Sequence, residues 1–193
     1  MRNLITFRLL DYWHAGAGHG AGRLLDAAVK RSPAGLPILP GRTVKGLMRD
    51  AVRQCEQFGH LSSGITEELF GSKLGTGRFE TEAGVLSFGN AELGEEWEDY
   101  AQTDEGKRLV PAFFDELAST AIGDDGQAEE GSLRRIEVAI PLTLRAPWSV
   151  DDPQFVDPAQ QALAKSVGLV RRLGVSRNRG LGRVQVSLSK EGE

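Results

Sequence analysis

Apolar residues recur in the stretch Leu36–Phe58 with the spacing of one buried face of an α-helix. The pattern predicts a helix that begins at Val44, with Thr43 as its cap and Gly59 as its stop. Two prolines ahead of this helix favour an extended lead-in, and Gly41 permits a sharp turn. The apolar positions are Val44, Leu47, Met48, Ala51, Val52, Cys55 and Phe58.

Alternation of apolar and polar residues predicts β-strands in four other places. In the first strand, Ile5, Phe7 and Leu9 lie on one side. A second helix is expected to open at Asp157 and to end at Gly174. The expected strands are Asn3–Leu10, Gly84–Glu92, Ile136–Arg145 and Arg183–Leu188.

The order of these elements indicates an α/β fold of the α+β type. We expect an RRM-like or ferredoxin-like βαββαβ antiparallel sheet with two helices on one face. The chain has 193 residues, 40% of them hydrophobic, which is the size of a single domain, 1–193. A Gly-, Ser- and Thr-rich insertion is expected at about 60–83. A second segment, at about 119–134, should project from the body, because 123–131 holds four acids, three glycines and no large apolar residue.

The composition narrows the range of functions. The sequence has no run of about 18 apolar residues and no signal-peptide pattern, so we expect a soluble cytoplasmic protein without a membrane partner. The net charge of −4 argues weakly against a general nucleic-acid binder. The single cysteine, Cys55, excludes an internal disulfide. The three histidines and Cys55 lack the paired spacing of a structural zinc site, so no metal site is predicted from them.

Positive charge is concentrated in two places. Arg42 stands just before the predicted helix, and Lys45, Arg49 and Arg53 recur along a face other than the apolar one. A turn followed by a helix start aims free N–H groups and positive charge at one place, which suits a phosphate. The ordinary alternative is an amphipathic helix with a solvated basic face. The second place is Lys165–Arg183, which holds six basic residues and no acid.

Three arginines and several glycines lie in the turn Gly174–Arg183, between the second helix and the last strand. The arginines are Arg177, Arg179 and Arg183. Backbone amides and guanidinium groups in such a turn can surround one phosphodiester. The alternative is a tight helix-to-strand connection with charged tips.

A second glycine-rich loop, Trp13–Arg23, follows the first strand, and its backbone can approach a ligand closely. Three of its small residues match the G-x-G-x-x-G/A dinucleotide fingerprint formally. Prolines prevent a long helix from following, so a dinucleotide site is not predicted. Asp26 is the only acid between Asp11 and Asp50. A lone aspartate beside a turn ordinarily accepts backbone hydrogen bonds.

Four segments of the chain resemble, in order, motifs of the CRISPR-associated RAMP superfamily, in particular the backbone subunits of type III effector complexes. Together they span nearly the whole chain, and the second is the most specific. The four segments are Trp13–Gly18, Leu36–Arg49, Leu69–Gly71 with Val85–Ala91, and Asn178–Arg183.

The resemblance implies that the chain binds a guide RNA, a target RNA, copies of itself and other effector-complex subunits. The helix start and the glycine-rich turn would form the two halves of an RNA cradle. The projecting segment would be a thumb that wedges between guide and target strands. The implied RNA-binding residues are His14, His19, Arg42, Lys45, Arg49, Arg177, Arg179, Gly180, Gly182 and Arg183.

The resemblance also implies a catalytic role for Asp26, because backbone subunits that cut target RNA carry an aspartate at this place. Its carboxylate would orient a 2′-hydroxyl of the RNA or hold Mg²⁺ against the scissile phosphate. We therefore expect a guide-RNA-binding subunit that is also a metal-dependent endoribonuclease. Two alternatives stay open: a non-catalytic structural subunit, and a guide-processing endoribonuclease that uses His14 or His19 for acid–base catalysis.

Overall fold

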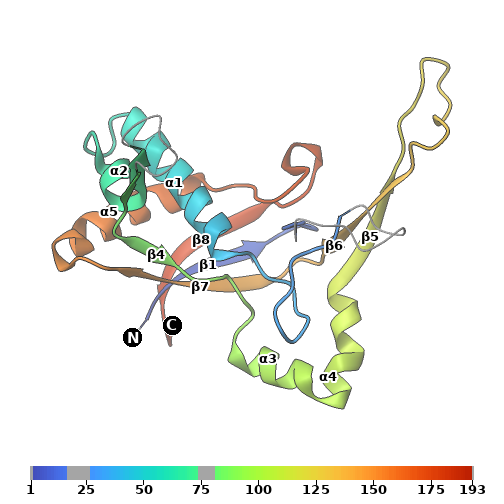
Figure 1. The fold of residues 1–193 in the computed structure, drawn as a ribbon, viewed down its shortest axis with the longest axis horizontal. Helices are drawn as coiled ribbons and strands as arrows, with labels where there is room; N and C mark the ends of the chain where they lie inside the picture. The colour runs from blue at the N-terminus through green and yellow to red at the C-terminus, as the bar shows by residue number, and fades with distance from the viewer. Residues whose placement is uncertain (1, 17–26, 74–80, 193) are drawn as a thin grey trace.

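A four-stranded antiparallel sheet forms the centre of the protein (Figure 1). The structure is a computed structural model, and it describes residues 2–16, 27–73 and 81–192. The strands lie in the order β8-β1-β7-β4, and α1 and α5 cover one face of the sheet (Figure 1). This order is that of a ferredoxin-like βαββαβ unit, so the predicted fold is confirmed. The bounds are β1 Asn3–Leu9, α1 Gly41–Gln57, β4 Leu86–Phe88, β7 Thr143–Val150, α5 Val156–Ser166 and β8 Val184–Lys190.

Strand β1 lies inside the sheet and pairs on both edges. Ile5 lies opposite Ala146 of β7 and Leu188 of β8. Ile5 and Phe7 are fully buried, whereas alternate residues of the strand are more exposed. The alternation predicted for the first strand is therefore confirmed.

Helix α1 buries the predicted apolar face, but it begins at Gly41 rather than at Val44. Thr43 does not cap it; instead, the side-chain oxygen of Asn90 accepts a hydrogen bond from the Gly41 N–H at 3.0 Å. Gly41 is required because a Cβ there would lie 2.6 Å from the carbonyl oxygen of Phe88. Phe58, predicted to be buried, is 76% exposed just beyond the helix.

Two element boundaries differ from the prediction. The expected strand Ile136–Arg145 is two strands, β6 (Arg134–Ala139) and β7, separated at Pro141, which lacks the N–H that a continuous ladder needs. The second helix ends at Ser166 and continues as the 3₁₀ turn η3 (Val167–Leu169), because the Ser166 hydroxyl bonds back to the Ala162 carbonyl and Gly168 follows.

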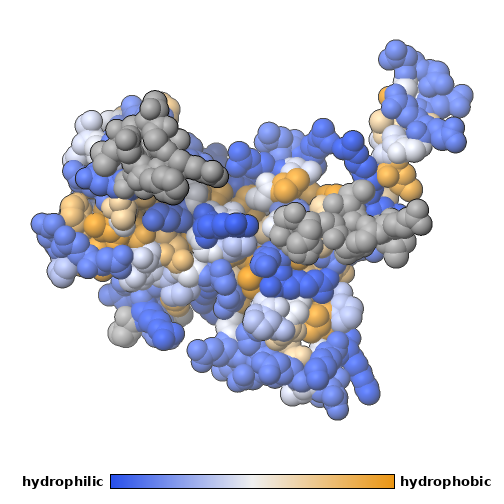
Figure 2. Space-filling view, in the orientation of Figure 1, coloured by the Kyte–Doolittle hydropathy of each residue, from blue (hydrophilic) through white to orange (hydrophobic). Residues whose placement is uncertain are grey.

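The remaining elements extend from the sheet. Strands β5 and β6 form a hairpin that projects far from the body, and its outer part contains segment 119–134 (Figure 1). On the face shown in Figure 2, the tip of this hairpin is almost wholly hydrophilic. No helix in the described part of the chain has the length and apolarity to cross a membrane. The bounds are α2 Ile65–Phe70, β2 Gly71–Lys73, β3 Thr81–Ala83, α3 Glu95–Gln102, α4 Asp104–Leu109, η1 Val110–Phe113, β5 Phe114–Ser119, η2 Pro153–Phe155 and η4 Arg177–Arg179.

Glu56, near the end of α1, holds the start of α2. Its two carboxylate oxygens accept hydrogen bonds from the N–H groups of Gly64, at 2.6 Å, and Thr66, at 3.1 Å. Burial alone would raise the pKa of Glu56, but the bonds from Thr66 and Gly64 outweigh burial and lower it. The ionised carboxylate is therefore the form that stabilises this junction.

We expect Glu56→Gln to lower the free energy of unfolding at pH 7 by about 1 kcal/mol, because it removes charge-assisted hydrogen bonds. The Tm should fall by about 2 to 4 °C. Because the folded-state pKa is depressed, the stabilisation is complete above the ordinary value of 4.5 and is lost as pH falls through the folded-state pKa. Thermal melts from pH 7 to pH 3 should show the two Tm values converging in acid. Glu116→Gln, at an exposed glutamate, is the control, and a pH-independent Tm difference would contradict the assignment.

Candidate nucleic-acid interface

The glycine-rich turn before β8 has a backbone shape that only small residues allow at two positions. Gly174 and Gly182 have φ of 81° and 70°. A Cβ on Gly174 would overlap the carbonyl oxygen of His14, and one on Gly182 would overlap that of Leu173. Gly180 also has a positive φ, 93°, but faces open space. The turn is thus tightly packed at its ends and open at its tip.

Backbone hydrogen bonds join both ends of this turn to the segment that follows β1. The Val175 N–H donates to His14 O at 2.9 Å, and the Gly182 N–H donates to Tyr12 O at 2.8 Å. The Tyr12 hydroxyl in turn donates to Asp115 of β5 at 3.0 Å. This hydrogen bond, and then the Asp115 charge, raises the pKa of Tyr12. The glycine-rich turn therefore lies beside residues 12–14, which follow β1.

Two of the three arginines in the turn have free charges. Arg177 and Arg179 are exposed, and neither forms an ion pair with a described residue. Arg183 is paired with Asp11, with Nε 3.3 Å from Oδ2. The Arg172 side chain donates to the Arg177 carbonyl oxygen at 2.7 Å and so stabilises the turn. The exposed pair is suited to bind an anion, because its charge is not neutralised within the described chain.

The basic residues of α1 are used differently from the prediction. Lys45 donates to the carbonyl oxygen of Leu86 at 3.1 Å, and Arg49 donates to that of Gly71 at 3.0 Å. These bonds tie α1 to β4 and β2, so both side chains have structural roles. Arg42 is exposed, with no ion-pair partner among the described residues.

The start of α1 offers few free N–H groups to a phosphate. The Gly41 N–H binds Asn90, and the N–H groups of Thr43 and Val44 both donate to Pro40 O. The expectation that this helix start holds a phosphate through free amides is therefore wrong for three of its first four N–H groups.

The two halves of the predicted RNA cradle meet different flanks of α1. Arg177 lines a groove of about 400 Å³ together with Leu47 and Asp50 of α1. At 100° per residue, these two positions lie on the flank of α1 opposite to Lys45 and Arg49. Arg177 thus lies beside the flank of α1 opposite to its basic row.

His14 lies in the interior rather than on an RNA-facing loop. It is 1% exposed, and its Nδ1 donates to the carbonyl oxygen of Glu137 at 2.6 Å. Its imidazole is therefore placed to brace β6, and the prediction that it contacts RNA has no support in this geometry. Gly182 is likewise buried, with its N–H bound to Tyr12, whereas Gly180 is exposed.

Two predicted residues, His19 and Asp26, lie outside the described residues. Ala27, which follows Asp26 in the sequence, accepts a hydrogen bond from the Glu137 N–H at 3.0 Å. Within 2–16, 27–73 and 81–192, no three His, Cys, Asp or Glu side chains lie close enough together to hold a metal ion. Asp26 is the only residue for which the sequence predicted a contact with Mg²⁺, so this cofactor stays a prediction.

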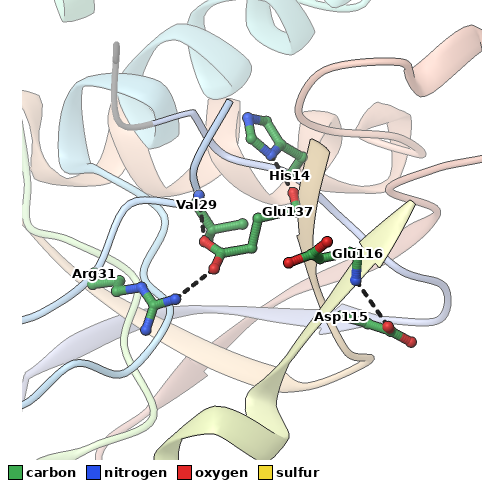
Figure 3. A network of polar contacts seen from close by, with 6 residues as sticks. All are labelled: His14, Val29, Arg31, Asp115, Glu116 and Glu137. Atoms are coloured by element: carbon green, nitrogen blue, oxygen red, sulfur yellow. Dashed lines mark hydrogen bonds and ion pairs between the residues drawn. The ribbon is translucent and has the colours of Figure 1, made fainter. Parts of the chain in front are cut away.

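Sequence reasoning missed a polar junction at the base of the hairpin. Figure 3 shows Val29, Arg31 and His14 converging on Glu137 of β6. The only sequence signal was a glutamate inside an apolar strand, and this pattern is more typical of a strand with one solvated face.

Comparisons with known proteins agree with this fold. The family model described as the RAMP superfamily matches residues 6–185. A chain in "Cryo-EM structure of the Type III-B Cmr-beta bound to cognate target RNA" is similar at a TM-score of 0.73 and 11% identity, with 97% of each chain covered. A chain of the same complex in its apo state gives a TM-score of 0.68 at 11% identity, covering 99% of this chain and 98% of that one.

A chain of a Type IV-B CRISPR complex is also similar, with a TM-score of 0.59 and 14% identity, covering 100% of this chain and 92% of that one. No curated protein sequence matches the chain. At such identities the structural likeness establishes the fold alone.

The two glycines of the turn allow a matched test of its packing. Gly180→Ala should cost about 1 to 2 kcal/mol, since an alanine is strained at positive φ. Gly182→Ala should cost at least about 1 kcal/mol more, because its methyl group also overlaps the Leu173 carbonyl. Urea unfolding of both variants measures the difference. Equal costs would show that the turn is not packed against Leu173.

Proposed function

The chain belongs to the RAMP superfamily, and on this basis we propose that it is a guide-RNA-binding backbone subunit of a type III-like CRISPR effector complex. Three observations support the proposal: the family match covers residues 6–185, the similar structures come from CRISPR complexes, and one of those complexes holds target RNA. Other effector subunits and further copies of this chain would be its protein partners.

The exposed pair Arg177 and Arg179 is the observation that carries the RNA-binding proposal. The whole chain is acidic, with a net charge of −4, so an RNA would be attracted to a local basic site rather than to the whole surface. Contacts between guanidinium groups and phosphate oxygens carry no sequence information. Base pairing between guide and target would then supply the sequence specificity.

The hairpin β5–β6 is proposed to enter between guide and target strands. Its tip carries Asp124, Asp125, Glu129 and Glu130, which repel phosphates. The tip also exposes Ile122, 62% accessible, and Leu133, 58% accessible. Apolar side chains of this kind can separate stacked bases at a modest free-energy cost. The hairpin would therefore act through its shape and these two residues rather than through phosphate contacts.

Asp26 is proposed as the residue that promotes target cleavage. A 2′-hydroxyl oxygen attacks the adjacent phosphorus and gives its proton to water. The bond from phosphorus to the 5′-oxygen breaks, and the 5′-oxygen takes up a proton from water. The products are a 2′,3′-cyclic phosphate and a 5′-hydroxyl. The carboxylate of Asp26 would orient the 2′-hydroxyl. A bound Mg²⁺ would neutralise charge on the phosphate.

Arg177→Ala with Arg179→Ala should weaken guide-RNA binding and make it less sensitive to salt. Two lost phosphate contacts should reduce the slope of log K against log salt concentration by about 1.4 for single-stranded RNA. Fluorescence anisotropy across a salt series measures both effects.

The control for this test is Lys107→Ala with Arg108→Ala, which makes the same charge change at exposed positions of α4. If both double variants change the slope equally, the glycine-rich turn is not the RNA site. Wild-type protein purified with a discrete RNA, at more than one chain per RNA, would support the backbone role.

Asp26→Ala should abolish target cleavage by the assembled complex while guide and target binding stay unchanged. Single-turnover cleavage of labelled target RNA, with and without Mg²⁺, and the dissociation constant of the same RNA are the measurements. Undiminished cleavage in the variant would remove Asp26 from the mechanism. A wild-type complex that binds target and leaves it whole in any divalent metal would instead identify a structural subunit.

A further inference from the structure

Glu137 is a buried carboxylate at the base of the projecting hairpin. It lies on β6 directly opposite Glu116 of β5, yet Glu137 is 8% exposed and Glu116 is solvent-exposed. A buried carboxylate is costly unless it is paired and hydrogen-bonded. The partners of Glu137 therefore indicate what its burial achieves.

All the polar groups of Glu137 bind segments that come earlier in the chain (Figure 3). Its carboxylate accepts from the Val29 N–H at 2.9 Å and forms an ion pair with Arg31. Its backbone N–H donates to Ala27 O, and its carbonyl accepts from the His14 ring. Glu137 thus connects β6 to two parts of the segment between β1 and α1: His14 and Ala27–Arg31.

Arg31 extends this junction to the other strand of the hairpin. Its guanidinium carbon lies 3.6 Å from the ring centre of Phe114, the first residue of β5. A cation over an aromatic face is attracted to it, and the ion pair with Glu137 holds the guanidinium in place. Segment Ala27–Arg31 therefore contacts both strands of the hairpin at its base.

We propose that Glu137 is a positioning residue that clamps segment Ala27–Arg31 to the hairpin, so that the two respond to RNA as one body. The inference rests on the proposed function, in which the hairpin enters the guide–target duplex and Asp26, the residue before this segment, promotes cleavage. A hairpin seated in the duplex would then set the position of the segment that continues from Asp26. Loss of the clamp should affect cleavage more than binding.

Glu137→Gln removes the ion pair while it keeps the shape of the side chain. In the assembled complex we expect single-turnover target cleavage to slow about tenfold or more, because small misplacements are costly in rate. The target dissociation constant should change by less than about twofold, which corresponds to less than about 0.5 kcal/mol. Arg31→Ala, at a partly exposed side chain, removes the same ion pair from its other partner and should slow cleavage similarly. A thermal melt of each variant checks that it is folded, because either change breaks the ion pair of a buried carboxylate. The double variant should be no slower than either single variant, because both break the same clamp.

The matched control is Glu116→Gln, the same chemical change on the facing residue, whose side chain has no hydrogen-bond partner among the described residues. It should leave cleavage unchanged. A readout independent of activity is amide exchange at Val29, which should accelerate in Glu137→Gln and not in Glu116→Gln.

Each outcome separates the clamp from the proposed function. Equal cleavage by the two glutamine variants, or equal losses of cleavage and target affinity in Glu137→Gln, would overturn the positioning role. A wild-type complex that binds target without cutting it would contradict the proposed cleavage instead. In that case amide exchange at Val29 tests the clamp, and an exchange rate unchanged in Glu137→Gln would overturn it.

Discussion

The segment from Tyr12 to Ala15 is the point on which the arrangement of the other loops depends. Trp13 exchanges backbone hydrogen bonds with Ala139 of β6, at 3.0 and 2.8 Å, and its indole N–H donates to Ile140 O. The carbonyls of Tyr12 and His14 bind the glycine-rich turn, and Ala15 O accepts from Lys30. One extended stretch of four residues therefore joins the hairpin base, the arginine turn and the lead-in to α1. Because backbone groups make these bonds, the arrangement depends little on side-chain identity.

The sequence predicted the body of the fold well because burial there follows simple periodicities. Ile5, Phe7 and Leu9 alternate on β1, and Val44 and Met48 repeat along α1, as a half-buried strand and an amphipathic helix require. The errors lie where a distant group decides the outcome. Asn90 caps α1 from 49 residues away, and no local rule identifies it in place of Thr43.

The strand break at Pro141 illustrates the same limit. Residues 136–145 alternate as one strand would, but the first part pairs with β5 and the second with β1. A proline at that point predicts a strand edge or a bulge, because proline lacks the N–H that a strand ladder needs. It does not predict that the chain passes from one sheet to another there, because that depends on which strands are available as partners.

Charged residues were the hardest part of the site to predict, since a sequence does not reveal what neutralises each charge. Lys45 and Arg49 looked like free cations on a helix surface, yet both donate to backbone carbonyls of neighbouring strands. Arg177 and Arg179 looked similar and have exposed side chains without an ion pair among the described residues. The difference follows from what lies beside each one. Carbonyl groups at the starts of β4 and β2 accept hydrogen bonds from the helix cations, whereas the tip of the glycine turn is open. The acidic tip of the hairpin completes this division of charge, because its carboxylates repel anions whereas the exposed arginines of the turn attract them.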